Sequence, residues 1–299
     1  MDMLRITGLC KSFGDKEVLR GLNLSVPEHS IFGFIGKNGS GKTTTMKTIL
    51  GLLSADAGEI WVNGEQVVYG QTATNRHIGY LPDVPEFYAF MTAGEYLKFC
   101  GEITGLSHTE NQARCKELLA LVGLSNEKHR IKGFSRGMKQ RLGIAQALLN
   151  RPKLLICDEP TSALDPVGRK EILDILLAVK EQTTVLFSTH ILSDVERICT
   201  DVAVLHNGVA SLQGKLADIK SRYSSHSYYL EVQTPKDATS LAQILPQMKV
   251  MSPTQLVFSE KDYALHQVLE VLTSNRTPIL KIERIDPTLE TLFMEVIEQ

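Results

Sequence analysis

Apolar residues in the first part of the chain follow the two-residue period of β-strands. This alternation predicts strands over residues 4–8, 18–26 and 31–35. Residues 58–68 contain two short strand-like runs on either side of Asn63-Gly64, a pair that favours a type I′ hairpin turn because both of its residues accept a positive φ. Apolar residues at helical spacing fill residues 41–53. The order of strand, glycine-rich loop and helix is therefore predicted here.

The pattern turns helical between residues 92 and 150. Stretches with apolar residues at helical spacing end near Gly or Pro and predict helices over residues 92–105, 108–124 and 136–149. Strand and helix then alternate, with strands over 153–157 and 184–188, helices over 166–182 and 191–200, and an Asn-Gly hairpin over 202–214. Such alternation implies an α/β fold whose parallel sheet is covered on both faces.

A polar, serine-rich stretch at residues 220–227 interrupts the periodicity and predicts a domain boundary. We therefore expect one domain over residues 1–220 and a small α+β accessory domain, of ferredoxin-like type, over residues 227–299. Its predicted strands and helices cover residues 227–232, 239–245, 255–259, 263–272, 279–285 and 288–297. This domain carries no convergent polar cluster in its sequence, so a second active site is not expected there.

Composition excludes several classes of protein. Apolar residues make up 43% of the 299 residues and charged residues 22%, which is typical of folded rather than disordered chains. The formal charge of −2 gives no basic excess for nucleic acid. Five scattered cysteines without CxxC spacing indicate reduced thiols and a reducing compartment. No run of about 18 apolar residues and no signal-peptide pattern occur, so a membrane role is expected only through a partner.

The segment Gly36–Thr43 reads GKNGSGKT and matches the phosphate-loop pattern, between a predicted strand and a predicted helix. In this pattern the backbone N–H groups and the helix N-terminus face phosphate oxygens, Lys42 adds a full positive charge and the Thr43 hydroxyl binds Mg²⁺. A dinucleotide loop fits less well, because Thr44 stands where a third glycine would be needed. The expected ligand is a nucleoside triphosphate. Its predicted contacts are Gly36, Lys37, Asn38, Gly39, Ser40, Gly41, Lys42, Thr43 and Thr44.

Two carboxylates follow the buried strand LLIC, at the strand edge where open α/β sheets bind ligands. Asp158 can hold Mg²⁺ through water, and Glu159 can act on an attacking water as base or orienting group. A polar loop that merely ends a strand is the alternative for this pair taken alone. The phosphate loop in the same chain favours the catalytic interpretation.

Together these motifs resemble the ATP-binding subunit of an ATP-binding cassette (ABC) transporter over about residues 1–215. The segment FSRGMKQR (134–141) is similar to the family's signature sequence, and residues 162–165 are similar to its dimer-contact loop. The resemblance implies a cassette with a parallel sheet core, an antiparallel β subdomain and a helical subdomain at about residues 84–150. It also implies ATP and Mg²⁺ as ligands, and ATP held between two cassettes.

The resemblance further assigns roles to single residues. Ser135 and Gly137 would contact the γ-phosphate held by the other cassette, and Phe13 would stack on adenine. His190, at the end of TVLFSTH, would reach the γ-phosphate, although a lone histidine after a strand is more often a packed residue. With Glu159 and Lys42, His190 completes the predicted catalytic set. Thr43 and Asp158 form the predicted metal site, together with Asp83.

Asp83 stands where the family usually has glutamine. An aspartate there binds Mg²⁺ more strongly but reaches less far, and a solvated loop carboxylate is the alternative. The acidic residue, the GM-type signature and the C-terminal extension resemble the branch that exports drugs, antimicrobial peptides or other amphipathic molecules.

The expected function is therefore an ATP-hydrolysing motor at the cytoplasmic face of the membrane. It would work as a homodimer or with a paired cassette, on a separate integral-membrane permease and without nucleic acid. The permease would dock near residues 83–100, whose aromatic residues are alternatively the core of the helical subdomain. A soluble relative that acts on ribosomes or DNA is the competing function, but the chain has one cassette, no heptad insert and no basic bias.

Overall fold

The computed structural model describes residues 2–71, 73–222, 227–285 and 289–290. The chain divides into two compact units, Met1–Leu216 and Ala217–Gln299. Each unit has its own hydrophobic core. In the described residues no helix has the length and apolar character needed to cross a membrane.

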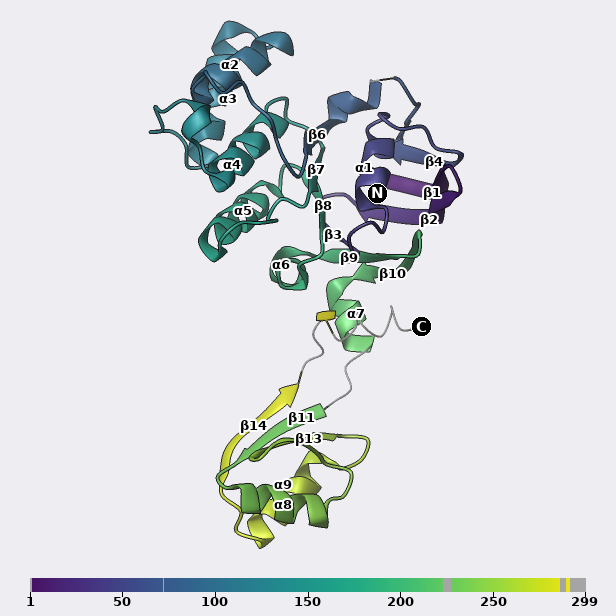
Figure 1. Ribbon diagram of the computed structural model, residues 1–299, viewed down its shortest axis with the longest axis vertical. Helices are drawn as coiled ribbons and strands as arrows, with labels where there is room; N and C mark the ends of the chain where they lie inside the picture. Colours follow the sequence, from purple (N-terminus) through teal and green to yellow (C-terminus); the bar gives the residue numbers. More distant parts are fainter. Residues whose placement is uncertain (1, 72, 223–226, 286–288, 291–299) are drawn as a thin grey trace. The chain divides into compact units, whose positions relative to one another are not determined.

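A six-stranded sheet forms the centre of the first unit (Figure 1). Its order is β10-β9-β3-β8-β7-β6, and every neighbouring pair is parallel except β10 with β9. The strands are β3 (Ile31–Ile35), β6 (Ile78–Leu81), β7 (Leu154–Asp158), β8 (Thr184–Thr189), β9 (Asp201–His206) and β10 (Val209–Lys215). Strands β3, β7 and β8 are almost entirely buried, as strands covered on both faces must be.

A four-stranded antiparallel sheet of order β2-β1-β4-β5 completes the β structure of this unit. Its strands are β1 (Asp2–Phe13), β2 (Lys16–Pro27), β4 (Ala57–Val62) and β5 (Glu65–Gln66). Both predicted Asn-Gly turns are present with positive φ at each residue, 50° and 78° at Asn63-Gly64 and 47° and 80° at Asn207-Gly208. These are the signs that a type I′ turn requires.

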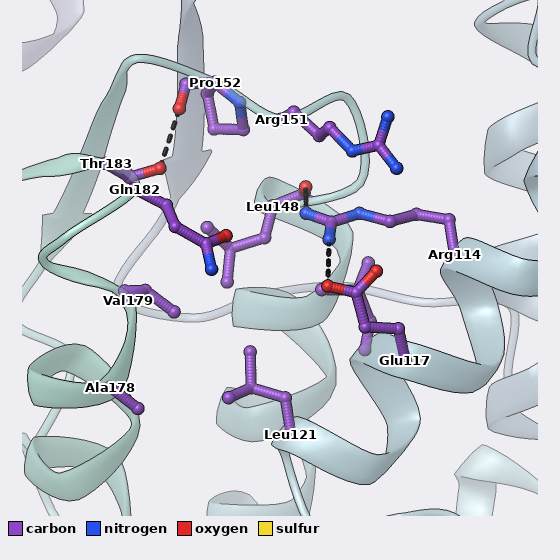
Figure 2. Close-up of a pocket in the computed structure, with 11 residues that line it drawn as sticks. Arg114, Glu117, Leu121, Leu148, Arg151, Pro152, Ala178, Val179, Gln182 and Thr183 are labelled. Carbon is purple, nitrogen blue, oxygen red and sulfur yellow. Dashed lines mark hydrogen bonds and ion pairs between the residues drawn. The ribbon is translucent and has the colours of Figure 1, made fainter.

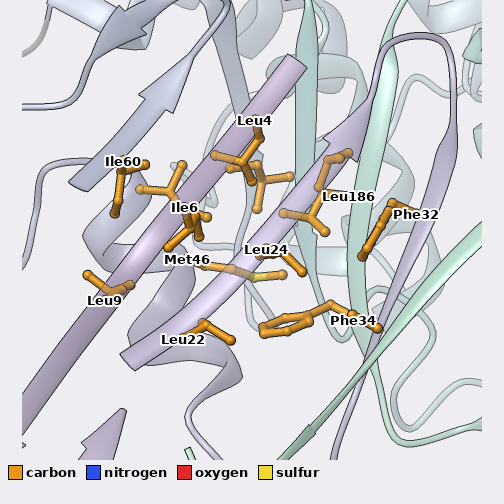
Figure 3. Packing of buried hydrophobic residues seen from close by; sticks show 14 of the residues in the cluster. Leu4, Ile6, Leu9, Leu22, Leu24, Phe32, Phe34, Met46, Ile60 and Leu186 are labelled. Atoms are coloured by element: carbon orange, nitrogen blue, oxygen red, sulfur yellow. The ribbon is translucent and has the colours of Figure 1, made fainter. Parts of the chain in front are cut away.

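The main core lies between the antiparallel sheet and the six-stranded sheet, and helix α1 (Lys42–Ile49) contributes to it (Figure 3). Leu4 and Ile6 of β1 meet Phe34 of β3 and Met46 of α1 in this cluster, and each is at most 2% exposed. Full burial of such side chains contributes about 1.5–3 kcal/mol each. This packing fixes the phosphate loop, which joins β3 to α1.

Four of the described α-helices of this unit begin at side-chain caps. Thr92 and Ser107 form capping boxes with the glutamates three residues later, and Asp165 caps a helix that has Pro166 at its first position. The α-helices are α2 (Ala93–Ile103), α3 (His108–Leu121), α4 (Arg136–Ala147), α5 (Pro166–Val179) and α6 (Leu192–Ile198), with 3₁₀ turns η1 (Ala73–His77) and η2 (Ile131–Gly133). The helices predicted in the first unit are all confirmed, each shorter than predicted. In Figure 1 α4, α5 and α6 lie on one side of the six-stranded sheet and α1 on the other.

The second unit contains a β-α-β-β-α-β sequence of elements, which is the ferredoxin-like arrangement. These are β11 (Ser227–Val232), α8 (Pro235–Ile244), β12 (Lys249–Ser252), β13 (Gln255–Ser259), α9 (Leu265–Ser274) and β14 (Ile279–Ile285), preceded by α7 (Leu216–Arg222). The sheet order is β12-β13-β11-β14, with all pairs antiparallel. The predicted α+β class is confirmed. The element predicted at 288–297 lies almost wholly outside the described residues.

Candidate nucleotide-binding site

A cavity of about 460 Å³ lies where the phosphate loop meets the carboxyl ends of β7 and β8. The order of strands brings these segments together, because β3 lies beside β8 and β8 beside β7. The lining residues come from five parts of the chain: Lys16, Val18, Asn38, Gly39, Gly41, Lys42, Thr43, Thr44, Asp83, Asp158, Glu159, Ser162 and His190. Most of the residues predicted from the sequence to bind phosphate or metal thus line one cavity.

Lys42 is the buried cation of this cavity. It is the first residue of α1 and only 6% exposed. Its Nζ donates hydrogen bonds to the carbonyl oxygens of Gly36 at 2.7 Å and Lys37 at 3.3 Å, and lies 3.2 Å from Oε1 of Glu159. The positive end of α1 is added to this charge. The loop is therefore folded around a cation, as an anion-binding site needs.

Asp158 is held by two hydroxyl groups. The Thr43 hydroxyl donates to Oδ2 at 2.7 Å, and the Ser188 hydroxyl donates to Oδ1 at 2.6 Å. Asp158 is 3% exposed, so these bonds compensate a charge that burial would otherwise make costly. A carboxylate and a hydroxyl oxygen within hydrogen-bond distance are hard ligands that suit Mg²⁺. The residues present therefore fit the metal that the sequence predicts.

Glu159 has a strained backbone, and the two oxygens of its carboxylate differ in their contacts. Its φ is +48°, in the left-handed region that a residue with a Cβ rarely adopts. Its N–H donates to the carbonyl oxygen of Ser188 at 3.2 Å and to the Ser188 hydroxyl at 3.0 Å. Oε2 lies 2.9 Å from Nδ1 of His190, whereas the buried Oε1 has no aligned hydrogen bond within the described part of the chain. The side chain thus keeps one acceptor available to a further donor.

The remaining predicted residues do not line the cavity. Gly36, Lys37 and Ser40 are part of the phosphate loop itself, whereas Phe13, Ser135 and Gly137 belong to other segments of the cassette. Phe13 ends β1 with half of its surface exposed, and Nζ of Lys11 lies 5.6 Å from the centre of its ring. Ser135 is exposed and caps α4, where its hydroxyl accepts the N–H of Met138 at 3.2 Å. Gly137 lies in the first turn of the same helix. A single chain therefore does not bring Ser135 and Gly137 to its own phosphate loop.

Comparison with known proteins gives a consistent family. Residues 19–162 match the family model "ABC transporter", and residues 214–297 match "ATP-binding protein DrrA1-3-like, C-terminal domain". The chain is 39% identical to the uncharacterized ABC transporter ATP-binding protein YxlF of Bacillus subtilis, covering 99% of each chain. It is 35% identical to the bacitracin transport ATP-binding protein BcrA of Bacillus licheniformis, covering 99% of this chain and 97% of that protein.

The chain belongs to the ATP-binding subunits of ABC transporters. It is also 32% identical to the linearmycin resistance ATP-binding protein LnrL of Bacillus subtilis over 98% of each chain. A solved structure described as an ATP-binding subunit of an ABC transporter superposes with a TM-score of 0.66 at 34% identity, covering 74% of this chain and 93% of that one. The predicted family, cassette fold and ATPase class are thereby confirmed, and the cassette binds and hydrolyses ATP to power transport.

Ser188 is a residue of the cassette that contacts both acidic residues and that the sequence interpretation missed. It pairs in register with Asp158 on the neighbouring parallel strand. Its position near the carboxyl end of β8, two residues before His190, was the available signal. Lys16 and Val18 of β2 and Ser162 of the loop after Glu159 also line the cavity and were not predicted as ligands.

A buried network supports the loop that follows Glu159. The Thr161 hydroxyl donates to Oδ2 of Asp194 at 2.7 Å, and Nη2 of Arg169 lies 2.6 Å from the other oxygen of that carboxylate. Thr161 and Asp194 are at most 3% exposed. The loop therefore cannot shift without breaking a buried hydrogen bond to a carboxylate.

Ionisable groups next to the site have raised pKa values. Burial raises the pKa of Tyr80 to about 12, with a further contribution from the negative charge of Asp158. Burial likewise raises the pKa of the Cys157 thiol well above its usual value. Both groups are therefore neutral at physiological pH and add no negative charge beside Asp158.

A second cavity of about 300 Å³ lies between α3, the end of α4 and the end of α5 (Figure 2). The Arg114 guanidinium at its wall donates to the carbonyl oxygen of Leu148 at 2.7 Å and pairs with Glu117, also at 2.7 Å. Its charge is satisfied inside the protein, and Leu121 and Val179 make much of the wall apolar. We therefore interpret this cavity as a gap in the packing between helices and not as a ligand site.

Proposed function

We propose that the cassette hydrolyses ATP with Glu159 as the group that orients and deprotonates the attacking water. The single observation that carries this proposal is the position of Glu159. Its buried Oε1 lies beside Lys42 and has no aligned hydrogen bond to any residue that the structure describes, and its Oε2 contacts His190. The water attacks the γ-phosphorus, and the bond from that phosphorus to the oxygen bridging the β- and γ-phosphates breaks. Lys42 and His190 stabilise negative charge on the transferred phosphoryl group.

Thr43 and Asp158 would hold Mg²⁺ at this site. When bound, the ion neutralises charge on the β- and γ-phosphates. The Thr43 hydroxyl would then give up its hydrogen bond to Asp158 and turn an oxygen lone pair toward the ion. The sequence also predicts Asp83 as a third metal ligand, but its carboxylate is paired with Arg136, and the two roles are alternatives.

The active unit we propose is a head-to-tail dimer of cassettes, either of two copies of this chain or of this chain and a paired cassette. Ser135 and Gly137 lie at an exposed helix start, outside their own nucleotide cavity. A helix start presents N–H groups and partial positive charge to an anion. In the dimer this anion is the γ-phosphate held by the partner, and Phe13 stacks on adenine.

The dimer in turn drives a separate integral-membrane permease from the cytoplasmic face. The docking surface we propose is the exposed aromatic pair Tyr88 and Phe90, 51% and 62% exposed with ring centres 5.9 Å apart. Tyr96 behind them is buried and packs edge-on against Phe87. The predicted aromatic segment thus divides into a buried part and an exposed part. The exposed part has the amphipathic aromatic character that protein interfaces favour.

The cargo class we propose is drugs, peptides or other amphipathic molecules, moved outward. Support comes from the relatives named for bacitracin transport and linearmycin resistance, which the chain matches over nearly its whole length. The similarity includes the C-terminal unit, which matches its own family model over residues 214–297. We also propose, as the sequence predicts, that the cassette ends at residue 220 and that the accessory domain begins at residue 227.

Dimer formation is tested with Glu159→Gln, which should retain ATP without turnover. On addition of ATP and Mg²⁺ its mass should double, as measured by light scattering. Adding Ser135→Asp should abolish the dimer, because a carboxylate there would face the partner's γ-phosphate while still capping α4. The matched control is Ser135→Asn, which also caps the helix but carries no charge. Equal dimerisation of both variants would refute the proposed interface.

A further inference from the structure

The cavity contains three carboxylates, and each has a different compensating partner. Glu159 lies beside Lys42 and His190, and Asp158 accepts hydrogen bonds from Thr43 and Ser188. All four of these partners belong to the cavity wall or its strands.

Asp83 is compensated from outside that wall. Its Oδ1 lies 3.2 Å from Nη2 of Arg136, the first residue of α4. Arg136 does not appear among the residues that line the cavity, whereas Asp83 does. A cation of the signature segment therefore holds a carboxylate of the chain's own nucleotide site.

The same helix also holds the backbone of Asp83. Gln140, one turn after Arg136 and fully buried, donates from Nε2 to the carbonyl oxygen of Asp83 at 2.6 Å. Residues four apart lie on one face of a helix. Two side chains on one face of α4 thus grip a single residue, one at its carboxylate and the other at its main chain.

Close packing continues the contact along α4. A Cβ at Gly143 would lie 2.5 Å from Cδ1 of Leu81 and 3.4 Å from Cβ of Pro85, the residues on either side of the Asp83 loop. Positions 136, 140 and 143 follow the i, i+4, i+7 spacing of one helix face. The loop and the first two turns of α4 are therefore packed as one body.

We propose that Arg136 is a positioning residue for the nucleotide site, and that it acts by holding the Asp83 carboxylate away from the triphosphate. Asp83 is then the partner of Arg136 rather than a ligand of the metal. The pair also ties the cavity to the signature turn that carries Ser135 and Gly137. This inference rests on the proposed function, because it assumes that the cavity binds ATP and that the signature turn takes part in the same ATPase cycle.

Electrostatics gives the direction of the effect. Without Arg136 the Asp83 carboxylate is free to turn toward the phosphates, and like charges repel. Without Asp83, loss of Arg136 has little consequence, because the arginine itself does not line the cavity. The pair is half-exposed, with side-chain exposures of 42% and 48%. Exposed pairs contribute up to about 1 kcal/mol, which corresponds to about fivefold in affinity.

A double-mutant cycle on ATP affinity tests this inference in the full chain. Arg136→Gln should weaken ATP binding about two- to fivefold in the otherwise wild-type protein. In the Asp83→Asn background the same substitution should change affinity by much less. Arg136→Lys should restore most of the affinity, and added salt should shrink the effect of Arg136→Gln, because screening weakens exposed charge interactions.

Matched controls distinguish a specific effect of the Arg136–Asp83 pair from the effect of changing the local net charge. Lys139→Gln removes another cation of the first turns of α4, and Glu86→Gln removes another carboxylate of the loop; neither should alter affinity. An effect of Arg136→Gln that is equal in both backgrounds would overturn the proposal. So would Asp83→Asn weakening Mg·ATP severalfold but not metal-free ATP, which is the result expected of a metal ligand.

Failure of the inference can be distinguished from failure of the proposed hydrolytic function. The cycle measures binding and depends on neither turnover nor dimers. Lys42→Ala should abolish binding in every background if the cavity is the nucleotide site. If that variant fails to bind while the Arg136 effect stays additive, only the inference about Arg136 and Asp83 is wrong.

Discussion

At the scale of single residues, the proposed chemistry depends on how the backbone holds Glu159. A glutamate with φ of +48° persists only where its surroundings hold it, and strain of this kind costs about 1–3 kcal/mol. Ser188 supplies that support, because it accepts the N–H of Glu159 and donates to Asp158. One serine thus aligns both the predicted base and the predicted metal ligand.

Ser188→Ala should therefore lower kcat by about ten- to hundredfold, the effect of losing a hydrogen bond to a charged group. ATP affinity should change much less, because the phosphate loop is untouched. Phosphate release and equilibrium nucleotide binding measure the two quantities separately. Ser193→Ala, an exposed serine of α6, is the control. An unchanged kcat in Ser188→Ala would mean that Glu159 is held by the loop alone.

At the scale of elements, local signals predicted most of what the structure contains. Asn63-Gly64 and Asn207-Gly208 could be recognised as turns, because a type I′ turn needs a positive φ at both central residues and Asn and Gly adopt it most readily. The strand β7 is recognisable because a strand buried on both faces is continuously apolar. Short edge elements such as β6 and β12, with only four residues each, carry too little periodicity to be recognised.

The site was predictable to the extent that its residues lie in contiguous motifs. The phosphate loop and the acidic pair are such motifs, and both line the cavity. Contacts across the chain were not predictable: Ser188 meets Asp158 through strand pairing, and Arg136 meets Asp83 through helix packing. Tertiary partners of this kind are chosen by the fold and leave no mark in local sequence.

The packing of α4 on β6 and its loop gives a prediction at this scale. Gly143→Ala should destabilise the cassette by about 1–3 kcal/mol, because the added methyl group overlaps the Leu81 side chain. Gly133→Ala is the control, since a Cβ at that position meets nothing within 4 Å. Denaturant unfolding compares the two variants. Equal stability would show that the loop can move away from α4 without cost.

At the scale of the whole molecule, all residues of the proposed ATPase site belong to the first unit. The second unit has its own core of apolar residues and a ferredoxin-like order of strands. The lining of the nucleotide cavity comes only from residues 16–190. The proposed ATP site thus lies within the cassette, while the second unit falls in the region over which the chain also matches YxlF and BcrA.

The most direct test of this account is phosphate release by the purified full chain with ATP and Mg²⁺, measured beside Glu159→Gln. We expect turnover by the wild type, its loss on chelation of Mg²⁺, and a rate for the variant lower by about 10²–10⁴-fold, the contribution of a general base. The variant should still bind ATP, because Lys42 and the phosphate loop remain. Hydrolysis by Glu159→Gln at the wild-type rate would contradict the central claim that Glu159 activates the water.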